Sequence, residues 1–207
     1  SSAAIFGHIA RFIIPYSIVL IPLVFYTLFS LLGRLVSHFW SGGRYVEYAA
    51  IGIGCVVCVI LIIGHFWGSK HLVVREVTVE SDRIPAGFDG YRIVQLSDIH
   101  LASQRTQPEF MTEIVDKVNT MNADMVCVTG DLVTIDYREI QDTNNPDNPN
   151  FAKDLKRIKA KDGVFSILGN HDYHQYSHLP EAAVKKNLEI FKQKQRDLGW
   201  RLLLNES

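Results

Sequence analysis

Two long runs of apolar residues without charged side chains lie in the first third of the chain, from Phe12 to Leu32 and from Ala49 to Trp67. A helix of about twenty residues crosses a hydrocarbon core of roughly 30 Å, and the prolines within the first run are compatible with such a helix. Aromatic residues, which favour membrane interfaces, lie near the ends of the runs at Trp40, Tyr45, Tyr48 and Trp67. The pattern predicts a membrane anchor of two transmembrane helices within residues 1–68.

A secretory signal peptide has one shorter apolar region, so the two runs favour a multi-pass membrane protein. Basic residues are divided almost evenly between the segment that joins the runs and the segments outside them. The positive-inside rule therefore leaves the side of the membrane that carries the rest of the chain undetermined.

Residues 69–90 are predicted to form an edge strand and a linker. The segment from Leu72 to Val79 alternates apolar and polar residues, as a strand at the edge of a sheet does. The segment from Ser81 to Gly90 contains proline and glycine and is typical of a turn-rich connection.

Short apolar runs alternate with helical patterns in residues 91–207. The runs Arg92 to Leu96, Met125 to Thr129 and Val164 to Leu168 have the length and composition of buried strands. Apolar residues recur at helical spacing after Pro108 and again from Phe151. A last helix is predicted from about Pro180 to Leu198, followed by a strand at Arg201 to Leu204. This order predicts an α/β domain whose mostly parallel sheet is covered on both faces.

Polar segments follow the three predicted strands directly, at Ser97 to His100, Gly130 to Asp131 and Gly169 to Asp172. Ligands of open α/β sheets bind beyond the carboxyl ends of the strands, which is where these segments fall. Asp98 and His100 are two residues apart, so both side chains would point to one face of a continuing strand and bind one cation.

The remaining side chains of these segments extend the predicted metal site. Asp131 arrives from a neighbouring strand and is placed to bridge two metals, and Asn170 offers a neutral carbonyl oxygen. His171 follows directly and is available for proton transfer. A mixed set of carboxylates and imidazoles suits Mn, Fe or Zn. Two such ions would share a hydroxide and clamp a phosphoryl group, which predicts phosphoester hydrolysis.

The segments Ser-Asp-Ile-His at 97–100, Gly-Asp-Leu-Val at 130–133 and Gly-Asn-His-Asp-Tyr at 169–173 resemble the first three motifs of the calcineurin-like metallophosphoesterases. The resemblance extends from about Tyr91 to the end of the chain and is greatest to the membrane-associated bacterial members. It implies that residues 91–207 form the first half of a metallophosphoesterase α/β sandwich.

The resemblance also implies a role for each motif residue. Asp98 and His100 would bind the first of two divalent metal ions, Asp131 would bridge both, and Asn170 would bind the second. His171 would stabilise the transition state or protonate the leaving oxygen. Asp98 would orient His171, with Asp172 supporting it, so the catalytic pair is His171 and Asp98.

The chain departs from the family pattern near its end. Family members carry a further histidine and a Gly-His-x-His motif beyond the segment where this sequence stops at Ser207. We expect the sequence to be part of a longer reading frame, with about half a metal site, weak metal affinity and little or no activity by itself. His174 and His178 are predicted to be loop residues near the mouth of the site, with substrate contact by His174 as the alternative.

These observations predict a membrane-anchored, metal-dependent phosphoester hydrolase, a phosphodiesterase or a phosphatase, that uses a two-metal centre and a bridging hydroxide. The alternative is a catalytically silent membrane protein that binds a phosphorylated ligand or partner. Proximity to the bilayer favours a lipid-linked phosphorylated substrate. A formal net charge of −1 argues against a dedicated nucleic-acid binder.

Overall fold

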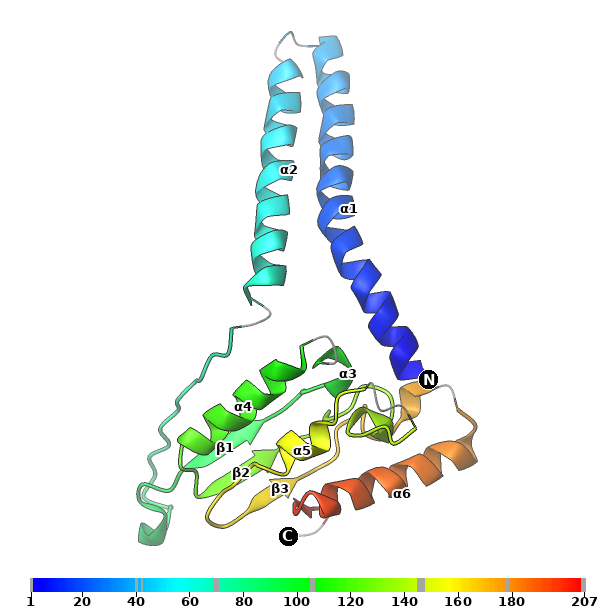
Figure 1. The fold of residues 1–207 in the computed structure, drawn as a ribbon. Helices are drawn as coiled ribbons and strands as arrows, with labels where there is room; N and C mark the ends of the chain where they lie inside the picture. The colour runs from blue at the N-terminus through cyan, green and yellow to red at the C-terminus, as the bar shows by residue number, and fades with distance from the viewer. Residues whose placement is uncertain are drawn as a thin grey trace. The chain divides into compact units, whose positions relative to one another are not determined.

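The computed structural model describes residues 2–39, 41, 43–68, 71–104, 107–144, 148–177 and 179–205. The chain divides into two compact units, one formed by residues 8–74 and the other mainly by residues 75–207. In Figure 1 the first unit runs from blue to cyan and the second from green to red.

The first unit is a pair of helices, α1 (Ser2–Phe39) and α2 (Gly43–Phe66). Within them, the segments Tyr16–Phe39 and Tyr45–Phe66 are long and apolar enough to cross a membrane. These segments overlap the predicted runs at 12–32 and 49–67. The two helices contact each other where the Ser30 hydroxyl donates to Glu47 Oε1 at 3.3 Å. A Cβ atom at Gly33 would lie 3.3 Å from the Gly43 carbonyl oxygen, so a small residue suits this crossing.

Residues 71–80 have no regular secondary structure, which contradicts the predicted edge strand at 72–79. The side chains of Val73, Val77 and Val79 are 64%, 83% and 73% exposed. A strand needs a neighbour that accepts and donates its ladder hydrogen bonds. Among the described residues the sheet contains no strand from this segment, so the alternating pattern has no partner to pack against.

The second unit is built on a parallel four-stranded sheet in the order β1-β2-β3-β4. The strands are β1 (Ile93–Leu96), β2 (Met125–Val128), β3 (Val164–Ser166) and β4 (Arg201–Leu202). Leu96, Val128, Ser166 and Leu202 lie side by side in register, because each is paired with the next. The carboxyl ends of the strands therefore lie along one edge. The predicted strands are confirmed, although most are shorter than the apolar runs that predicted them.

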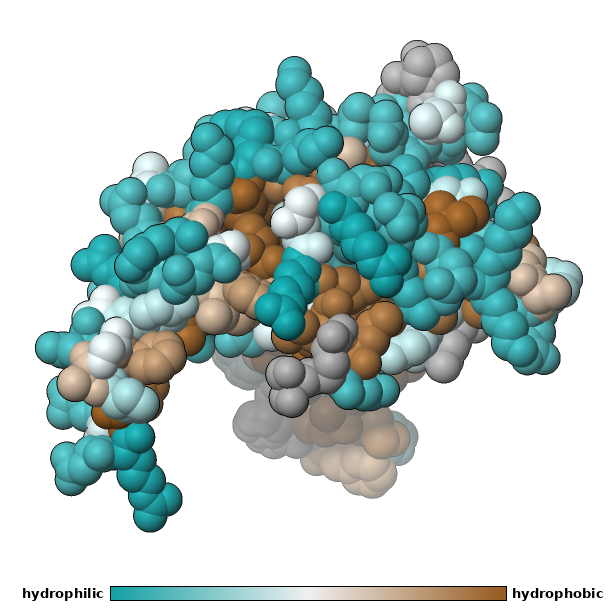
Figure 2. All heavy atoms as spheres, turned by 90° about the horizontal axis from the view of Figure 1, so that it is seen from below, coloured by the Kyte–Doolittle hydropathy of each residue, from teal (hydrophilic) through white to brown (hydrophobic). Residues whose placement is uncertain are grey.

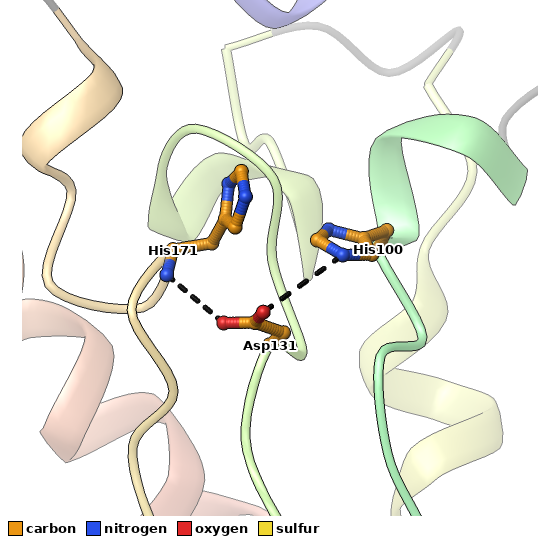
Figure 3. Close-up of side chains that lie close together, drawn as sticks. All are labelled: His100, Asp131 and His171. Atoms are coloured by element: carbon orange, nitrogen blue, oxygen red, sulfur yellow. Dashed lines mark hydrogen bonds and ion pairs between the residues drawn. The ribbon is translucent and has the colours of Figure 1, made fainter.

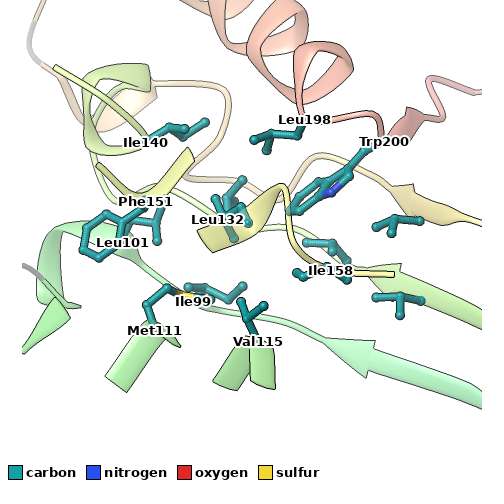
Figure 4. Close-up of a cluster of buried hydrophobic side chains, with 14 of the residues drawn as sticks. Ile99, Leu101, Met111, Val115, Leu132, Ile140, Phe151, Ile158, Leu198 and Trp200 are labelled. Atoms are coloured by element: carbon teal, nitrogen blue, oxygen red, sulfur yellow. The ribbon is translucent and has the colours of Figure 1, made fainter. Parts of the chain in front are cut away.

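The helices between the strands join one hydrophobic core (Figure 4). They are α3 (Leu101–Gln104), α4 (Pro108–Thr120), α5 (Phe151–Leu155) and α6 (Glu181–Asp197), with short 3-10 helices η3 (Tyr137–Glu139) and η4 (Gln175–Ser177). A further 3-10 helix, η2 (Ala86–Phe88), precedes β1 and buries none of its residues. Helix α4 begins with proline at its first position, which suits a helix start. It buries Met111, Val115 and Val118. The helix was predicted from the spacing of Phe110, Ile114, Val118 and Met121, of which only Val118 is buried.

Helices α4, α5 and α6 cover one face of the sheet, whereas coverage of both faces was predicted. Buried residues of these helices share a single cluster with Val126, Val128 and Val164, which point to one side of the strands. Right-handed crossovers between strands that follow one another in sequence order place their helices on the same side. On the opposite face Ile93 stays 59% exposed. In the view from below, Figure 2 shows hydrophobic residues reaching the surface among hydrophilic ones.

Candidate metal centre

The chain leaves the sheet in sharp turns at the carboxyl ends of β1 and β2. Asp98, His100 and Asp131 have φ values of 54°, 46° and 53°, in the left-handed region that residues other than glycine rarely adopt. Such conformations concentrate at functional sites, where the surrounding structure enforces them. The turns also mean that Asp98 and His100 do not lie on a continuing strand, so their two-residue spacing does not place them on one face.

The two turns remain joined by main-chain hydrogen bonds beyond the strands. The amides of Asp98 and His100 donate to the carbonyl oxygens of Gly130 and Asp131 at 3.2 and 3.0 Å. The next amide, that of Leu101, donates to Leu132 at 3.0 Å. The segments that carry His100 and Asp131 are therefore held as one unit.

Two glycines allow the ends of β2 and β3 to approach each other. A Cβ atom at Gly130 would lie 2.6 Å from Gly169 Cα, and one at Gly169 would lie 2.5 Å from the Asp131 nitrogen. No real Cβ contact is that short, so both positions require glycine. Gly130 also has a φ of 98°, which glycine adopts without strain.

His100, Asp131 and His171 come together at this edge (Figure 3), each offering a ligand atom within 4.8 Å of the others. His100 Nε2 lies 4.0 Å from Asp131 Oδ2. The main-chain amide of His171 donates to Asp131 Oδ1 at 2.9 Å. The two imidazole rings meet edge to face, with centroids 4.8 Å apart.

The orientation of His171 is set by a main-chain carbonyl group. His171 Nδ1 lies 2.8 Å from the carbonyl oxygen of Thr134. Because a carbonyl oxygen only accepts, Nδ1 must carry the proton, and the neutral ring then has a free lone pair on Nε2. Histidines that bind metals or transfer protons are commonly fixed in this way. Asp98, which the family resemblance implies as the orienting residue, does not contact this ring among the described interactions.

The three side chains fit a divalent ion. Nitrogen and oxygen ligands lie about 2.0 to 2.2 Å from zinc, so two ligands of one ion are at most about 4.4 Å apart. The ligand atoms of the three side chains lie within 4.8 Å of one another, so a small inward shift of these side chains brings all three to bonding distance of one ion. In addition, His100 Nδ1 is buried and has no hydrogen-bond partner among the described residues. A buried polar atom of this kind requires a partner to be favourable.

Two buried carboxylates hold the loops around the site. Glu139 is fully buried and accepts hydrogen bonds from the amides of Ala102, Thr134, Ile135 and Asp136, at 2.6 to 3.2 Å. Asp172 accepts from the amides of Val133 and Gly169 at 3.1 and 2.9 Å. Burial raises the pKa of Glu139, and it raises the pKa of Asp172 to about 6. These carboxylates connect the loop after His100, the loop after Asp131 and the turn before His171.

Asp98 and Asn170 occupy neighbouring but different positions. Asp98 is exposed, accepts a hydrogen bond from the Ser97 hydroxyl and lies outside the group of three. Asn170 is exposed, and its amide nitrogen donates to the Tyr176 hydroxyl at 3.2 Å. Their assignment as metal ligands stays a prediction.

His174 is not a residue at the mouth of the site. It is fully buried, its ring packs edge to face on Phe191, and burial lowers its pKa. The expectation of an exposed loop was wrong because helix α6 packs over this turn. His178 lies outside the described residues.

Two residues of the site were not predicted. Glu139 completes a capping box with Asp136 at the start of η3, and the pattern Asp-Tyr-Arg-Glu at 136–139 could have indicated it. Tyr176 stacks on His171 with ring centroids 4.5 Å apart. No pattern in the sequence indicates that contact.

Comparison with known proteins identifies the domain. The family model of calcineurin-like phosphoesterases matches residues 91–205. The chain belongs to the calcineurin-like phosphoesterase family. Members of this family hydrolyse phosphoester bonds with the help of metal ions, and the cluster of His100, Asp131 and His171 lies within the matched segment.

Several curated calcineurin-like phosphoesterases resemble the chain. A metallophosphoesterase of Bacillus subtilis, YkuE, is 34% identical over 57% of the chain and 38% of its own length. A zebrafish transmembrane protein with a metallophosphoesterase domain is 26% identical over 77% of the chain and 35% of its own length. The UDP-2,3-diacylglucosamine pyrophosphatase LpxG of Chlamydia muridarum is 37% identical over 45% of the chain and 27% of its own length.

The chain spans only part of its relatives. The matched segments cover 38%, 31% and 29% of the first three curated calcineurin-like phosphoesterases. No solved structure matches the chain.

Proposed function

We propose that the protein is a membrane-anchored phosphoester hydrolase that uses two divalent metal ions. The observation that carries this proposal is the orientation of His171. Its Nδ1 is fixed on the Thr134 carbonyl, which leaves Nε2 free on a ring that lies beside His100 and Asp131. A ring held in this tautomer beside the ligand set is suited to proton transfer, which hydrolysis uses and a silent binding protein does not.

In this proposal Asp98 and His100 would hold the first ion, Asn170 would hold the second, and Asp131 would be shared by both. When bound, the two ions supply a water molecule activated for attack and neutralise charge on the phosphoryl oxygens. Asp131 is suited to a shared position because Oδ1 accepts from the His171 amide while Oδ2 faces His100. The protein ligands thus come from two adjacent strand ends and the turn after a third.

His171 is assigned the proton transfer. With Nδ1 engaged by Thr134, only Nε2 exchanges a proton with a reacting group. A protonated Nε2 stabilises negative charge on the phosphoryl group and then donates its proton to the leaving oxygen. Asp131 accepts from the main-chain amide of His171, which holds this residue beside the ligand set.

The substrate is proposed to be a phosphorylated, lipid-linked molecule. The two helices of membrane length and the likeness to transmembrane relatives support a location at the bilayer. The LpxG relatives, whose names describe a UDP-2,3-diacylglucosamine pyrophosphatase, support a lipid-linked phosphate as the chemical class. The bilayer and this substrate are the proposed partners.

The test is hydrolysis by the full-length protein, purified in detergent and supplied with Mn, of bis-(p-nitrophenyl) phosphate and of a panel of phosphorylated lipids. Exchange of His171 for alanine is expected to lower kcat about a hundred- to ten-thousand-fold, the usual contribution of a general acid. The matched control is His71→Ala, because His71 is exposed and lies outside the unit that carries the site.

Tight Mn binding without turnover of any ester would refute the proposed activity and favour the silent binding protein. Turnover of the soluble diester without turnover of lipids would refute the lipid-linked substrate alone.

A further inference from the structure

We propose that Tyr176 is a positioning residue that sets the orientation of both Asn170 and His171. The inference rests on the proposed function, because it assigns the Asn170 carbonyl oxygen to a metal ion. Tyr176 lies in η4, the single turn that follows the Gly-Asn-His-Asp motif.

The hydroxyl of Tyr176 fixes the amide of Asn170. Asn170 Nδ2 donates to this hydroxyl at 3.2 Å, and an amide that places its nitrogen on one side presents its oxygen on the other. A metal ion binds the oxygen and not the nitrogen. The hydrogen bond therefore favours the one amide orientation that can bind metal, and Asn170 needs this support because its side chain is exposed.

The ring of Tyr176 fixes the imidazole of His171. The rings stack with a centroid distance of 4.5 Å and an interplanar angle of 30°. The other flank of the imidazole meets His100 edge to face at 4.8 Å. Together with the bond from Nδ1 to Thr134, these two contacts leave the ring little freedom to rotate.

Tyr176 is itself held by a buried support. The turn begins at His174, whose carbonyl oxygen accepts from both the amide and the hydroxyl of Ser177, at 3.1 and 2.7 Å. His174 and Ser177 are buried, and the His174 ring packs on Phe191 of helix α6. Tyr176 stands between them and the site with its own side chain 51% exposed. Helix α6 thus supports the turn that carries Tyr176, and Tyr176 in turn orients the side chains of Asn170 and His171.

Two substitutions of Tyr176 separate its two contacts. Tyr176→Phe keeps the stacked ring and removes the hydroxyl, whereas Tyr176→Leu removes both. Tyr173→Phe is the matched control, because Tyr173 lies directly before this turn, is 42% exposed and has no contact with the three site residues among the described interactions.

The primary measurement is calorimetric titration of Mn into the full-length protein. We expect about a tenfold weaker affinity in Tyr176→Phe, the lower range for loss of a residue that orients a metal ligand. The same substitution in an Asn170→Ala background should change the affinity less than twofold, since its effect passes through Asn170. At saturating Mn, kcat should stay within twofold of wild type in Tyr176→Phe and fall at least tenfold in Tyr176→Leu.

The proposal is overturned if Tyr176→Phe binds Mn like wild type, or if it loses the same affinity in the Asn170→Ala background. A wild-type protein that binds Mn and hydrolyses nothing would refute the proposed function, while the titrations would still decide the role of Tyr176. If the wild type binds no metal, NMR spectra of the apo protein provide the test. The side-chain amide signals of Asn170 then show whether Tyr176 orients this residue. They should shift in Tyr176→Phe and not in Tyr173→Phe, and unchanged signals refute the proposal.

Discussion

The exchange of Glu139 for glutamine should be far from conservative, although the two side chains have nearly the same shape. In the structure Oε1 accepts from the amides of Ile135 and Asp136, and Oε2 accepts from those of Ala102 and Thr134. Glutamine keeps one oxygen, so its NH₂ group must face the second pair of N–H donors. Two hydrogen bonds are then lost, and two buried donors are left opposite another donor.

The expected cost follows from these losses. An unsatisfied buried group costs about 1 to 3 kcal/mol, so two of them cost about 2 to 6 kcal/mol. Burial raises the pKa of Glu139, which shows that the ionised form carries a desolvation cost that neutral glutamine avoids. We therefore expect the free energy of unfolding to fall by about 2 to 4 kcal/mol, a large share of the roughly 5 to 15 kcal/mol typical of a domain.

Pulse proteolysis of the full-length protein in urea measures this change without optical signals from the membrane helices. Hydrogen exchange read by mass spectrometry should at the same time show faster exchange in the segments 99–104 and 132–138. Glu189→Gln is the control, because Glu189 is 68% exposed and forms a surface ion pair with Lys192, and it should cost less than about 0.5 kcal/mol. A Glu139→Gln protein as stable as this control, with unchanged exchange, would refute the reasoning.

Three further predictions follow from other contacts. Gly169→Ala places a Cβ atom against Asp131 and should weaken Mn binding at least tenfold by calorimetry. The control Gly87→Ala, where a Cβ atom has no neighbour within 4 Å, should leave the affinity unchanged. Equal affinities of the two variants would contradict the close approach of Gly169 to Asp131. Burial raises the pKa of Asp172 from 3.8 to about 6, so the folded state binds the proton more tightly than the unfolded state. In metal-free protein the free energy of unfolding should therefore decrease by up to about 3 kcal/mol as the pH rises through this window and level off above it. Asp172→Asn should remove that slope in urea titrations at several pH values, and parallel slopes in both proteins would count against it. Asp116→Asn removes the ion pair with Arg157, in which the side chains of Arg157 and Asp116 are 43% and 55% exposed. In the same assay it should lower the free energy of unfolding by less than about 0.5 kcal/mol, and a loss above about 1 kcal/mol would be inconsistent with solvent screening.

The periodicity of apolar residues was sufficient to predict the elements of the second unit and the edge where the site lies. Strands β1, β2 and β3 and helix α4 formed where short apolar runs and helical spacing predicted them, because burial on one face selects both patterns. The segment at 72–79 shows the limit of this reasoning. Its pattern describes how a strand would pack but says nothing of whether a partner strand is present.

The geometry of the site depended on contacts that no sequence pattern encodes. The left-handed turns at Asp98 and His100 removed the simple two-residue relation between their side chains. His171 is oriented by the carbonyl group of Thr134, and every residue has such a group, so sequence inspection could not single it out. His174 looked like a loop residue because its burial depends on helix α6, which follows it in the chain.

Among the described residues, the carboxylates of Glu139 and Asp172 accept hydrogen bonds from main-chain N–H groups. Such contacts do not depend on which side chain the donor residue carries, so exchanges at residues 102, 133, 134, 135 and 136 leave these hydrogen bonds available. Proline is the exception, because it has no N–H to donate. In an alignment of relatives, the framework of the site would then appear as two positions that are always acidic and a set of positions that never contain proline. The sequence identity at the other positions of these loops could be low.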